Sequence, residues 1–240
     1  MSTAHTWLVT GSSRGIGLEL VRQLLEDPSN VVIAACRNPD GATVLKALHE
    51  SDAAKGELHV VGLDVSDEAS IRGSVKAVEQ ILGEGRGLDY LVNNAAAHNG
   101  DDSAFAFSSE AFTRIFQTNV VGPALMGEVY LPYLLKSTRK VIVNTSSGLG
   151  SISLDEYGPR FTTYAVTKTA LNMLTNKQAK ARPELTVISL CPGWVKTDMG
   201  GEAADLEPHE SVSGILKVVT SLGPKDSGKF CRYNGEEWPW

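Results

Sequence analysis

The chain has 240 residues, of which 42% are hydrophobic and 21% charged, and its formal net charge is −6. This composition fits one soluble α/β domain with a sizeable core. The acidic balance, without a long run of one sign, argues against a nucleic-acid or membrane partner. No apolar stretch reaches membrane-spanning length and no signal-peptide pattern opens the chain, so we expect a cytoplasmic protein. The cysteines and histidines form no metal-ligand pattern, so we expect no metal site.

Short apolar runs alternate with helical patterns for most of the chain. We expect strands at 7–9, 31–36, 58–63, 88–92, 141–144 and 185–190, and helices near 18–25, 41–51, 67–82, 109–136 and 160–181. Continuous apolar strands separated by helices predict a mostly parallel sheet covered on both faces. With right-handed crossovers this becomes a single doubly wound (Rossmann) domain over residues 1–240, with the ligand at the carboxyl ends of the strands.

A glycine-rich turn, TGSSRGIG at 10–17, joins the first strand to the first helix. Its glycines allow a tight turn and a close approach of the backbone to a pyrophosphate. The helix start offers unpaired N–H groups and a positive dipole end to that anion. Strand, turn and helix in this order therefore predict a dinucleotide site, although an ordinary strand-to-helix turn can have the same letters.

The residues after the second strand bear on the choice of cofactor. An acidic side chain there would bind the adenine ribose of NAD, but this chain has Arg37, and Arg14 lies in the glycine turn. Two guanidinium groups without a carboxylate favour the 2′-phosphate of NADPH, unless both are simply solvated. Asp64 and Val65, after the third strand, are candidates for contact with the adenine ring. Asp64 could instead cap the next helix.

Several motifs occur in one order along the chain. They are TGSSRGIG at 10–17, NNA at 93–95, Asn119, SS at 146–147, YAVTK at 164–168 and PG at 192–193. Together they resemble the short-chain dehydrogenase/reductase family along almost the whole chain. The ending at 228–240 and the letters PGWVKTDM at 192–199 resemble the C-factor and sniffer-type carbonyl reductases. One departure is NNAA at 93–96 in place of NNAG, whose extra methyl would crowd the ribose side of the cofactor or require a different turn.

Tyr164 and Lys168 are four residues apart, so on a helix they share one face. A free phenol has a pKa of about 10 and is a poor base near neutrality. A neighbouring ammonium favours the phenolate, so we expect the pKa of Tyr164 to be lowered. Tyr164 could then act as general acid in reduction and as general base in oxidation.

The resemblance implies roles for three further polar residues. Ser147 would orient and polarise the substrate carbonyl, with the adjacent Ser146 as the alternative. Asn119 would make a water-mediated link to Lys168 that completes a proton relay. The remaining expected contacts with NADPH/NADP are Gly11, Ser13, Arg14, Gly15, Ile16, Gly17, Arg37, Asp64, Val65, Asn93, Ala95, Tyr164, Lys168, Pro192, Gly193, Val195 and Thr197.

The substrate side of the site is described less fully by the sequence. The separation between Ser147 and Tyr164 is longer than is common in the family, and Tyr157 in the extra loop could touch substrate or simply be exposed. Trp194 is a candidate for the pocket wall. A short substrate loop is expected over about 198–213, and its small size would leave the pocket open to small or varied carbonyl compounds.

These observations predict an NADPH-dependent carbonyl reductase that converts aldehydes or ketones to alcohols by hydride transfer. An NAD-dependent alcohol dehydrogenase and a dinucleotide-binding signalling protein with incidental activity remain as alternatives. The long helices near 109–136 and 160–181 could pair with a second subunit in a homodimer or homotetramer, or could only cover the sheet.

Overall fold

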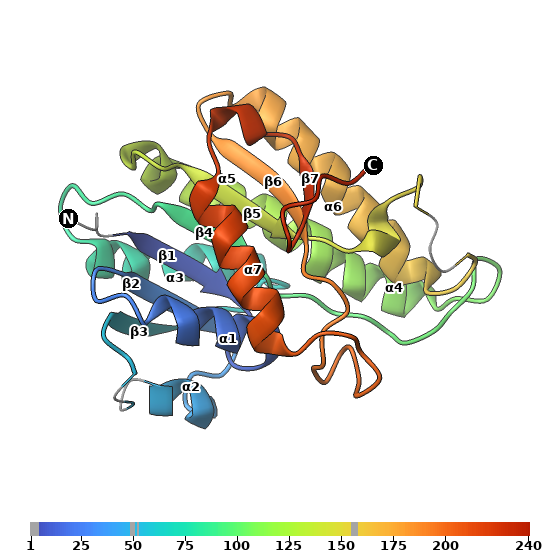
Figure 1. Ribbon diagram of the computed structural model, residues 1–240, viewed down its shortest axis with the longest axis horizontal. Helices are drawn as coiled ribbons and strands as arrows, with labels where there is room; N and C mark the ends of the chain where they lie inside the picture. The colour runs from blue at the N-terminus through green and yellow to red at the C-terminus, as the bar shows by residue number, and fades with distance from the viewer. Residues whose placement is uncertain (1–4, 49–50, 52, 155–157) are drawn as a thin grey trace.

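The structure is a computed structural model that describes residues 5–48, 51, 53–154 and 158–240. One seven-stranded sheet runs through it, with every neighbouring pair of strands parallel (Figure 1). Its order is β3 (Glu57–Gly62), β2 (Val31–Cys36), β1 (Thr6–Thr10), β4 (Tyr90–Asn93), β5 (Val141–Thr145), β6 (Thr186–Cys191) and β7 (Phe230–Arg232). The expected doubly wound sheet is thus confirmed.

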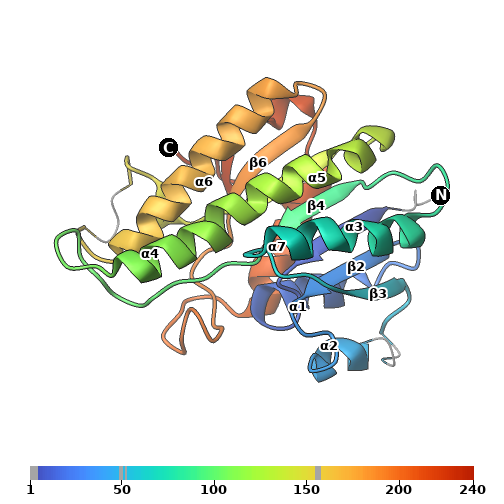
Figure 2. The same cartoon turned by 180° about the vertical axis from the view of Figure 1, so that it is seen from behind.

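Helices cover both faces of this sheet (Figures 1 and 2). On one face lie α1 (Gly15–Leu24) and α7 (Pro208–Ser221). On the other lie α3 (Glu68–Leu82), α4 (Ser109–Phe116), α5 (Gly122–Lys136) and α6 (Thr162–Ala181). The remaining short helices are α2 (Thr43–Leu48), the π-helical turn η1 (Gln117–Val121), and the 3₁₀ turns η2 (Gly148–Gly150) and η3 (Pro224–Asp226). Among the described helices, none has the length and apolar character needed to cross a bilayer.

Four features differ from the sequence-based expectation. The single helix expected over 109–136 is interrupted by η1, which is a wider turn between α4 and α5. α7 and β7 were not predicted, because α7 starts in a polar stretch and β7 has only three residues. The loop expected over 198–213 ends at Glu207, where Pro208 begins α7 and the Glu207 N–H donates to Glu210 Oε2 at 3.0 Å.

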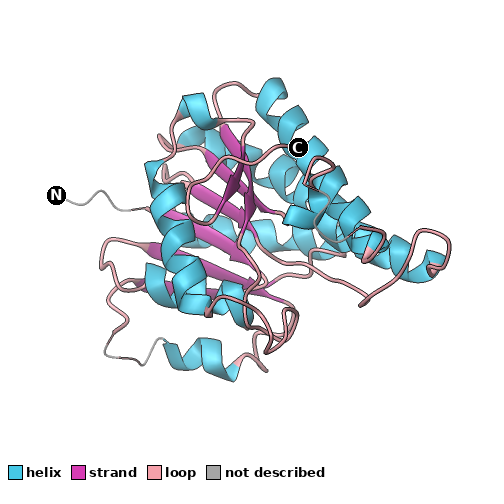
Figure 3. Cartoon of the chain, turned by 45° about the vertical axis from the view of Figure 1, so that its right-hand side comes forward, coloured by secondary structure: helices cyan, strands magenta, loops and turns pink. Residues whose placement is uncertain are grey.

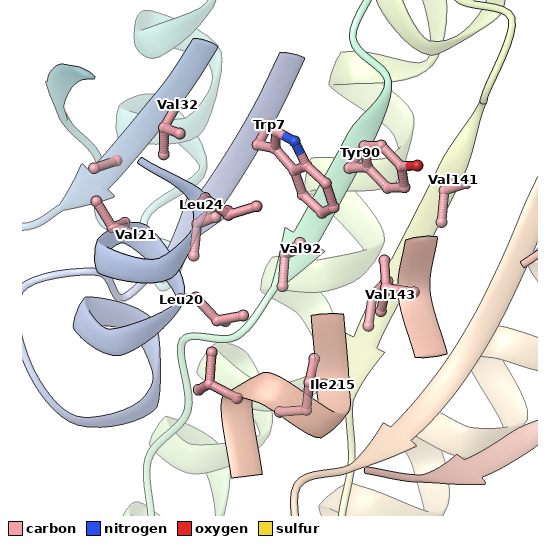
Figure 4. Packing of buried hydrophobic residues seen from close by; sticks show 14 of the residues in the cluster. Trp7, Leu20, Val21, Leu24, Val32, Tyr90, Val92, Val141, Val143 and Ile215 are labelled. Atoms are coloured by element: carbon pink, nitrogen blue, oxygen red, sulfur yellow. The ribbon is translucent and has the colours of Figure 1, made fainter. Parts of the chain in front are cut away.

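The core is divided between the two faces by the period-2 alternation of the strands. In β1, Trp7 and Val9 face α1 and α7, whereas Leu8 faces α3 and α5. Neighbouring strands follow the same alternation, as Figure 4 shows for the face that carries Trp7 and Ile215. Both faces are buried, which explains why the strands read as continuous apolar runs.

An aromatic stack links the two central strands. The rings of Trp7 on β1 and Tyr90 on β4 are 3.7 Å apart with an interplanar angle of 5°. The Trp7 indole N–H donates to Asn30 Oδ1 at 3.2 Å, and Arg139 Nε donates to the Tyr90 hydroxyl at 2.7 Å. The polar atoms of both large rings therefore have partners although both residues are buried.

We expect Trp7→Ala to lower the free energy of unfolding by about 3–5 kcal/mol, because it removes a fully buried ring and leaves a cavity. Urea unfolding of the cofactor-free protein measures this change. Val44→Ala, at a side chain that is 59% exposed, serves as the control and should change stability by less than about 0.5 kcal/mol. Equal effects of the two substitutions would contradict the prediction.

Candidate active site

The polar residues singled out in the sequence gather where the central strands end. The glycine turn follows β1, Asn94 and Ala95 follow β4, Ser146 and Ser147 follow β5, and Pro192 follows β6. Carboxyl ends of parallel strands meet at one edge of the sheet, which is where doubly wound proteins bind ligands. Figure 3 shows the loops that leave this sheet between the two helical layers.

Tyr164 and Lys168 lie on one face of α6, as their spacing predicts. Lys168 is only 2% exposed, and its Nζ donates to the Thr145 carbonyl at 2.7 Å. The same Nζ lies 5.4 Å from the centroid of the Tyr164 ring. The His98 ring, in the loop after β4, is edge-on to Tyr164 with a centroid distance of 6.3 Å. The phenol and the ammonium are therefore held together at the end of β5.

Burial dominates the acidity of this pair. It raises the pKa of Tyr164 above that of a free phenol, and the nearby Cys191 thiol acts in the same direction. Burial also lowers the pKa of Lys168 to about 8, against the opposing effect of Cys191. The expectation that Lys168 lowers the pKa of Tyr164 is therefore wrong for the protein alone, because desolvation penalises the charged forms of both groups.

The structure distinguishes the two adjacent serines. Ser146 is buried, and its Oγ donates to Asn172 Oδ1 at 2.6 Å, so its hydroxyl is used within the core. Ser147 is half-buried and caps the start of η2, where its Oγ accepts from the Leu149 N–H at 3.2 Å. The hydroxyl hydrogen of Ser147 has no acceptor among the described residues. Ser147 is thus the one that can donate to a bound carbonyl.

Asn119 lies in η1, and π-helical turns within helices often occur at functional sites. Its Oδ1 accepts from the Ala97 N–H at 2.8 Å. Its Nδ2 donates to the Ala97 carbonyl at 2.9 Å and to Thr167 Oγ1 at 3.0 Å. The amide thus joins the loop after β4 to the residue next to Lys168. Both amide hydrogens of Asn119 therefore have acceptors, and the water-mediated link to Lys168 stays a prediction.

The glycine turn has the geometry that a pyrophosphate requires. Gly11 and Gly15 have φ of +67° and +55°, which strains any other residue, and a Cβ on Gly17 would lie 2.2 Å from the Gly11 carbonyl oxygen. The Arg14 side chain does not cap α1, so the first N–H groups of this helix have no side-chain partner. The glycine turn and the start of α1 therefore fit a bound dinucleotide.

Asn94, which was not among the expected site residues, supports this turn. Its Nδ2 donates to the Thr10 carbonyl at 2.9 Å, and its own N–H and that of Ala95 donate to Thr10 Oγ1 at 3.0 and 3.1 Å. A Cβ on Gly11 would lie 2.8 Å from the Ala95 Cα. The β4 loop thus packs directly against the glycine turn. The double asparagine at 93–94 was the signal in the sequence, and the expected contact of Asn93 with the cofactor stays a prediction.

Asn93 has a role beneath the site. It is 3% exposed, and its Nδ2 donates to Asn144 Oδ1 at 2.8 Å. Asp64 is also occupied by local bonds, because its Oδ1 accepts from the Ser66 N–H at 2.9 Å and from Ser66 Oγ at 2.7 Å. The described structure therefore gives both side chains structural partners. Val65, next to Asp64, is buried against Gly122.

The two arginines have different surroundings. Arg37 follows β2 and lines a cavity of about 250 Å³. The other lining residues are Ser13, Asn38, Gly41, Ala42, Thr43 and Val44. Arg14 does not line it, and its guanidinium instead contacts Asp198 Oδ2 at 3.1 Å, with both side chains largely exposed. Asn38, which the sequence motifs did not single out, lies beside Arg37 in this lining.

The segment after β6 closes the other side of the site. Gly193 has φ of +82°, and Thr197 Cγ2 would lie 3.3 Å from a Cβ on Gly15, so this segment touches the glycine turn. Trp194 is 44% exposed, and its indole N–H donates to the Gly200 carbonyl at 2.8 Å. Its ring is therefore fixed at the surface. Tyr157 lies outside the described residues.

Other expected cofactor residues occupy the same loops. Ile16 packs its side chain against the core beneath the glycine turn, and Pro192 and Val195 are buried. In the described part of the chain, no group of three or more histidine, cysteine or acidic side chains could hold a metal ion.

Comparison with known proteins identifies relatives of all or much of the chain. An uncharacterized oxidoreductase of Schizosaccharomyces pombe is 30% identical over 258 residues, covering 100% of this chain and 99% of that protein. The C-signal of Myxococcus xanthus is 34% identical over 155 residues, covering 64% of this chain and 93% of that protein. These matches agree with the resemblance found in the sequence motifs.

Two solved structures share the fold over the full length of both chains. The NADPH-bound carbonyl reductase from chicken fatty liver is 36% identical with a TM-score of 0.91, covering 100% of each chain. Carbonyl reductase Sniffer of Drosophila melanogaster is 31% identical with a TM-score of 0.91, again covering 100% of each chain. The family model for short chain dehydrogenases matches residues 5–207. The chain is therefore an oxidoreductase that belongs to the short-chain dehydrogenase/reductase family.

Proposed function

We propose that this protein is an NADPH-dependent carbonyl reductase that converts aldehydes or ketones to alcohols. The observation that carries the proposal is the buried Tyr164–Lys168 pair beside the half-buried Ser147 hydroxyl. NADPH, when bound, supplies the hydride. The two structural relatives at 36% and 31% identity are both carbonyl reductases, which supports this choice within the family.

The raised pKa of Tyr164 suits reduction. A general acid must be protonated before the reaction, and burial keeps this phenol protonated at neutral pH. In our proposal the Tyr164 hydroxyl donates its proton to the carbonyl oxygen as that oxygen becomes an alkoxide. Oxidation of an alcohol would need the phenolate, which burial disfavours. The protonated Tyr164 is therefore the form that starts the reduction in this proposal.

Ser147 and Lys168 have complementary parts in this proposal. Ser147 donates its hydroxyl hydrogen to the carbonyl oxygen, which orients and polarises the substrate. Lys168 has three N–H donors, of which one is used by the Thr145 carbonyl. The other two are available to hold the nicotinamide ribose and to return a proton to Tyr164. Asn119 supports Lys168 through its bond to Thr167.

The cavity after β2 supports the proposed preference for NADPH. Arg37, Ser13 and Asn38 line it, and no carboxylate is among its lining residues. A guanidinium with neighbouring hydroxyl and amide groups suits a phosphate, whereas a ribose hydroxyl pair is usually bound by a carboxylate. Arg14 is a secondary candidate, since it would have to leave Asp198.

Tyr164→Phe should lower the rate of NADPH oxidation with aldehydes, ketones or diketones by about 10²–10⁴-fold, because it removes the proton donor. The affinity for NADPH should stay within about twofold of the wild type, because the phenyl ring keeps its packing. Steady-state kinetics and cofactor fluorescence measure the two effects. Undiminished turnover by the variant would refute the role of Tyr164. Cofactor binding without turnover by the wild type would instead favour a dinucleotide-binding signalling role.

Arg37→Glu should raise the dissociation constant of NADPH by about tenfold or more, because a carboxylate would face the 2′-phosphate. The dissociation constant of NADH should change by less than about threefold. Arg182→Glu makes the same charge reversal beyond the C-terminal end of α6 and serves as the control. If Arg37→Glu weakens both cofactors equally, the assignment of the 2′-phosphate site is wrong.

Lys168 should make the stability of the cofactor-free protein depend on pH. The pKa of Lys168 is about 8 in the folded chain, whereas its ordinary value is 10.5. Between pH 8 and pH 10.5 the unfolded chain therefore binds a proton at Lys168 that the folded chain does not bind. The free energy of unfolding should therefore rise by a few kcal/mol from about pH 8 to pH 10 relative to Lys168→Met. Urea unfolding of both proteins at several pH values measures the difference. A difference that stays constant with pH would contradict the lowered pKa.

A further inference from the structure

The chain ending noted in the sequence, at 228–240, runs back along the edge of the sheet. Residues 236–238 lie antiparallel to β7, because Arg232 N–H donates to the Glu236 carbonyl at 2.8 Å and Trp238 N–H donates to the Phe230 carbonyl at 2.8 Å. This segment covers the outer side of β7, which is the last strand of the sheet. The proposed chemistry of the site does not use it.

Aromatic contacts anchor the segment. Phe230 is 1% exposed, and the Trp240 ring stacks on it with a centroid distance of 5.6 Å and an interplanar angle of 19°. Trp238 meets the same Phe230 ring edge-on at 5.8 Å. Stacked and edge-to-face aromatic pairs of this kind are favourable beyond the area that they bury. Trp240 is therefore held against the sheet and not merely at the end of a loose tail.

From this anchor the segment reaches the serine loop, which we define as residues 147–154. Ser151 Oγ donates to the Pro239 carbonyl at 2.7 Å. The N–H and Oγ of Ser153 both donate to the Trp240 carbonyl, at 3.2 and 2.8 Å. Three hydrogen bonds thus join the serine loop to Pro239 and Trp240. Ser151 is buried at this contact.

The serine loop is held on its other side by α6. The Gly150 carbonyl accepts from Asn172 Nδ2 at 3.0 Å and from Thr169 Oγ1 at 3.1 Å. Within the loop, Gly150 N–H donates to the Ser147 carbonyl at 2.9 Å. Movement of the loop away from either support would therefore turn Ser147 relative to α6, which carries Tyr164.

We propose that Trp240 is a positioning residue for Ser147, acting through the hydrogen bonds of Pro239 and Trp240 to the serine loop. The step from position to catalysis rests on the proposed function. The physical reason is that a displacement of about 1 Å in a catalytic group costs up to about 100-fold in rate.

The first test measures the serine loop without any turnover. Amide hydrogen exchange at Leu149, Gly150 and Ser151 should be about tenfold faster in both Trp240→Ala and Ser153→Ala. Trp240→Ala removes the ring that holds the accepting carbonyls against Phe230, and Ser153→Ala removes one of the hydrogen bonds to the loop. Trp240→Phe keeps a ring against Phe230 and should exchange as the wild type does. Ile152→Ala is the control in the same loop, since that side chain is 78% exposed. Unchanged exchange in both Trp240→Ala and Ser153→Ala would overturn the proposal.

The second test asks whether the effect passes through Ser147. Trp240→Ala should lower kcat for carbonyl reduction by about tenfold, with the dissociation constant of NADPH within about twofold, and Trp240→Phe should restore kcat. In a Ser147→Ala background, single-turnover rates should fall by less than about twofold on adding Trp240→Ala, because the group to be positioned is gone. An equal fall in both backgrounds would show a merely structural role. Absence of wild-type turnover would count against the proposed function, while the exchange result would still decide whether Trp240 holds the loop.

Discussion

The buried ammonium of Lys168 is the constraint on which the site depends. A cation that is 2% exposed must be partnered, and here the Thr145 carbonyl at the end of β5 accepts from it at 2.7 Å. This bond fixes α6 against the carboxyl edge of the sheet at one register. Tyr164, one turn earlier on α6, is thereby brought to the point where the central strands end. Burial disfavours the charged form of Lys168, and it also keeps the Tyr164 phenol protonated.

A network of buried polar side chains supports this docking from below. Asn144 on β5 donates to Thr175 Oγ1 on α6 at 2.9 Å, and Ser189 Oγ on β6 donates to the same Thr175 oxygen at 2.8 Å. Asn93 on β4 donates to Asn144. These bonds join three neighbouring strands to one helix in the buried interior, where hydrogen bonds between polar side chains favour one arrangement of the strands and the helix. The helix that carries Tyr164 and Lys168 is thus tied to the core of the sheet.

Particular residues show how much of the site could be predicted from the sequence. Helical spacing predicted that Tyr164 and Lys168 share one face of a helix, whereas the order of the surrounding motifs was needed to choose them as site residues. The direction of the Tyr164 pKa could not be predicted, since it depends on desolvation, which is a property of all the packed neighbours. Likewise the letters of the glycine turn indicated a dinucleotide, but only the fold separated Arg37, which lines a cavity, from Arg14, which contacts Asp198.

The order of motifs along the whole chain indicated the family, and the alternation of apolar strands with helical patterns predicted the parallel sheet with helices on both faces. The four-residue spacing predicted that Tyr164 and Lys168 share one face of a helix. These features could be predicted because residue types, their order and their spacing are all present in the sequence. Tertiary structure alone decided which of two adjacent serines has a hydroxyl available, that Asn94 rather than Asn93 supports the glycine turn, and that Trp240 contacts the serine loop. Each of these depends on which groups far apart in the chain become neighbours. Hydrogen-bond partners and burial depend on how distant segments pack together, and this packing cannot be predicted from a local sequence pattern.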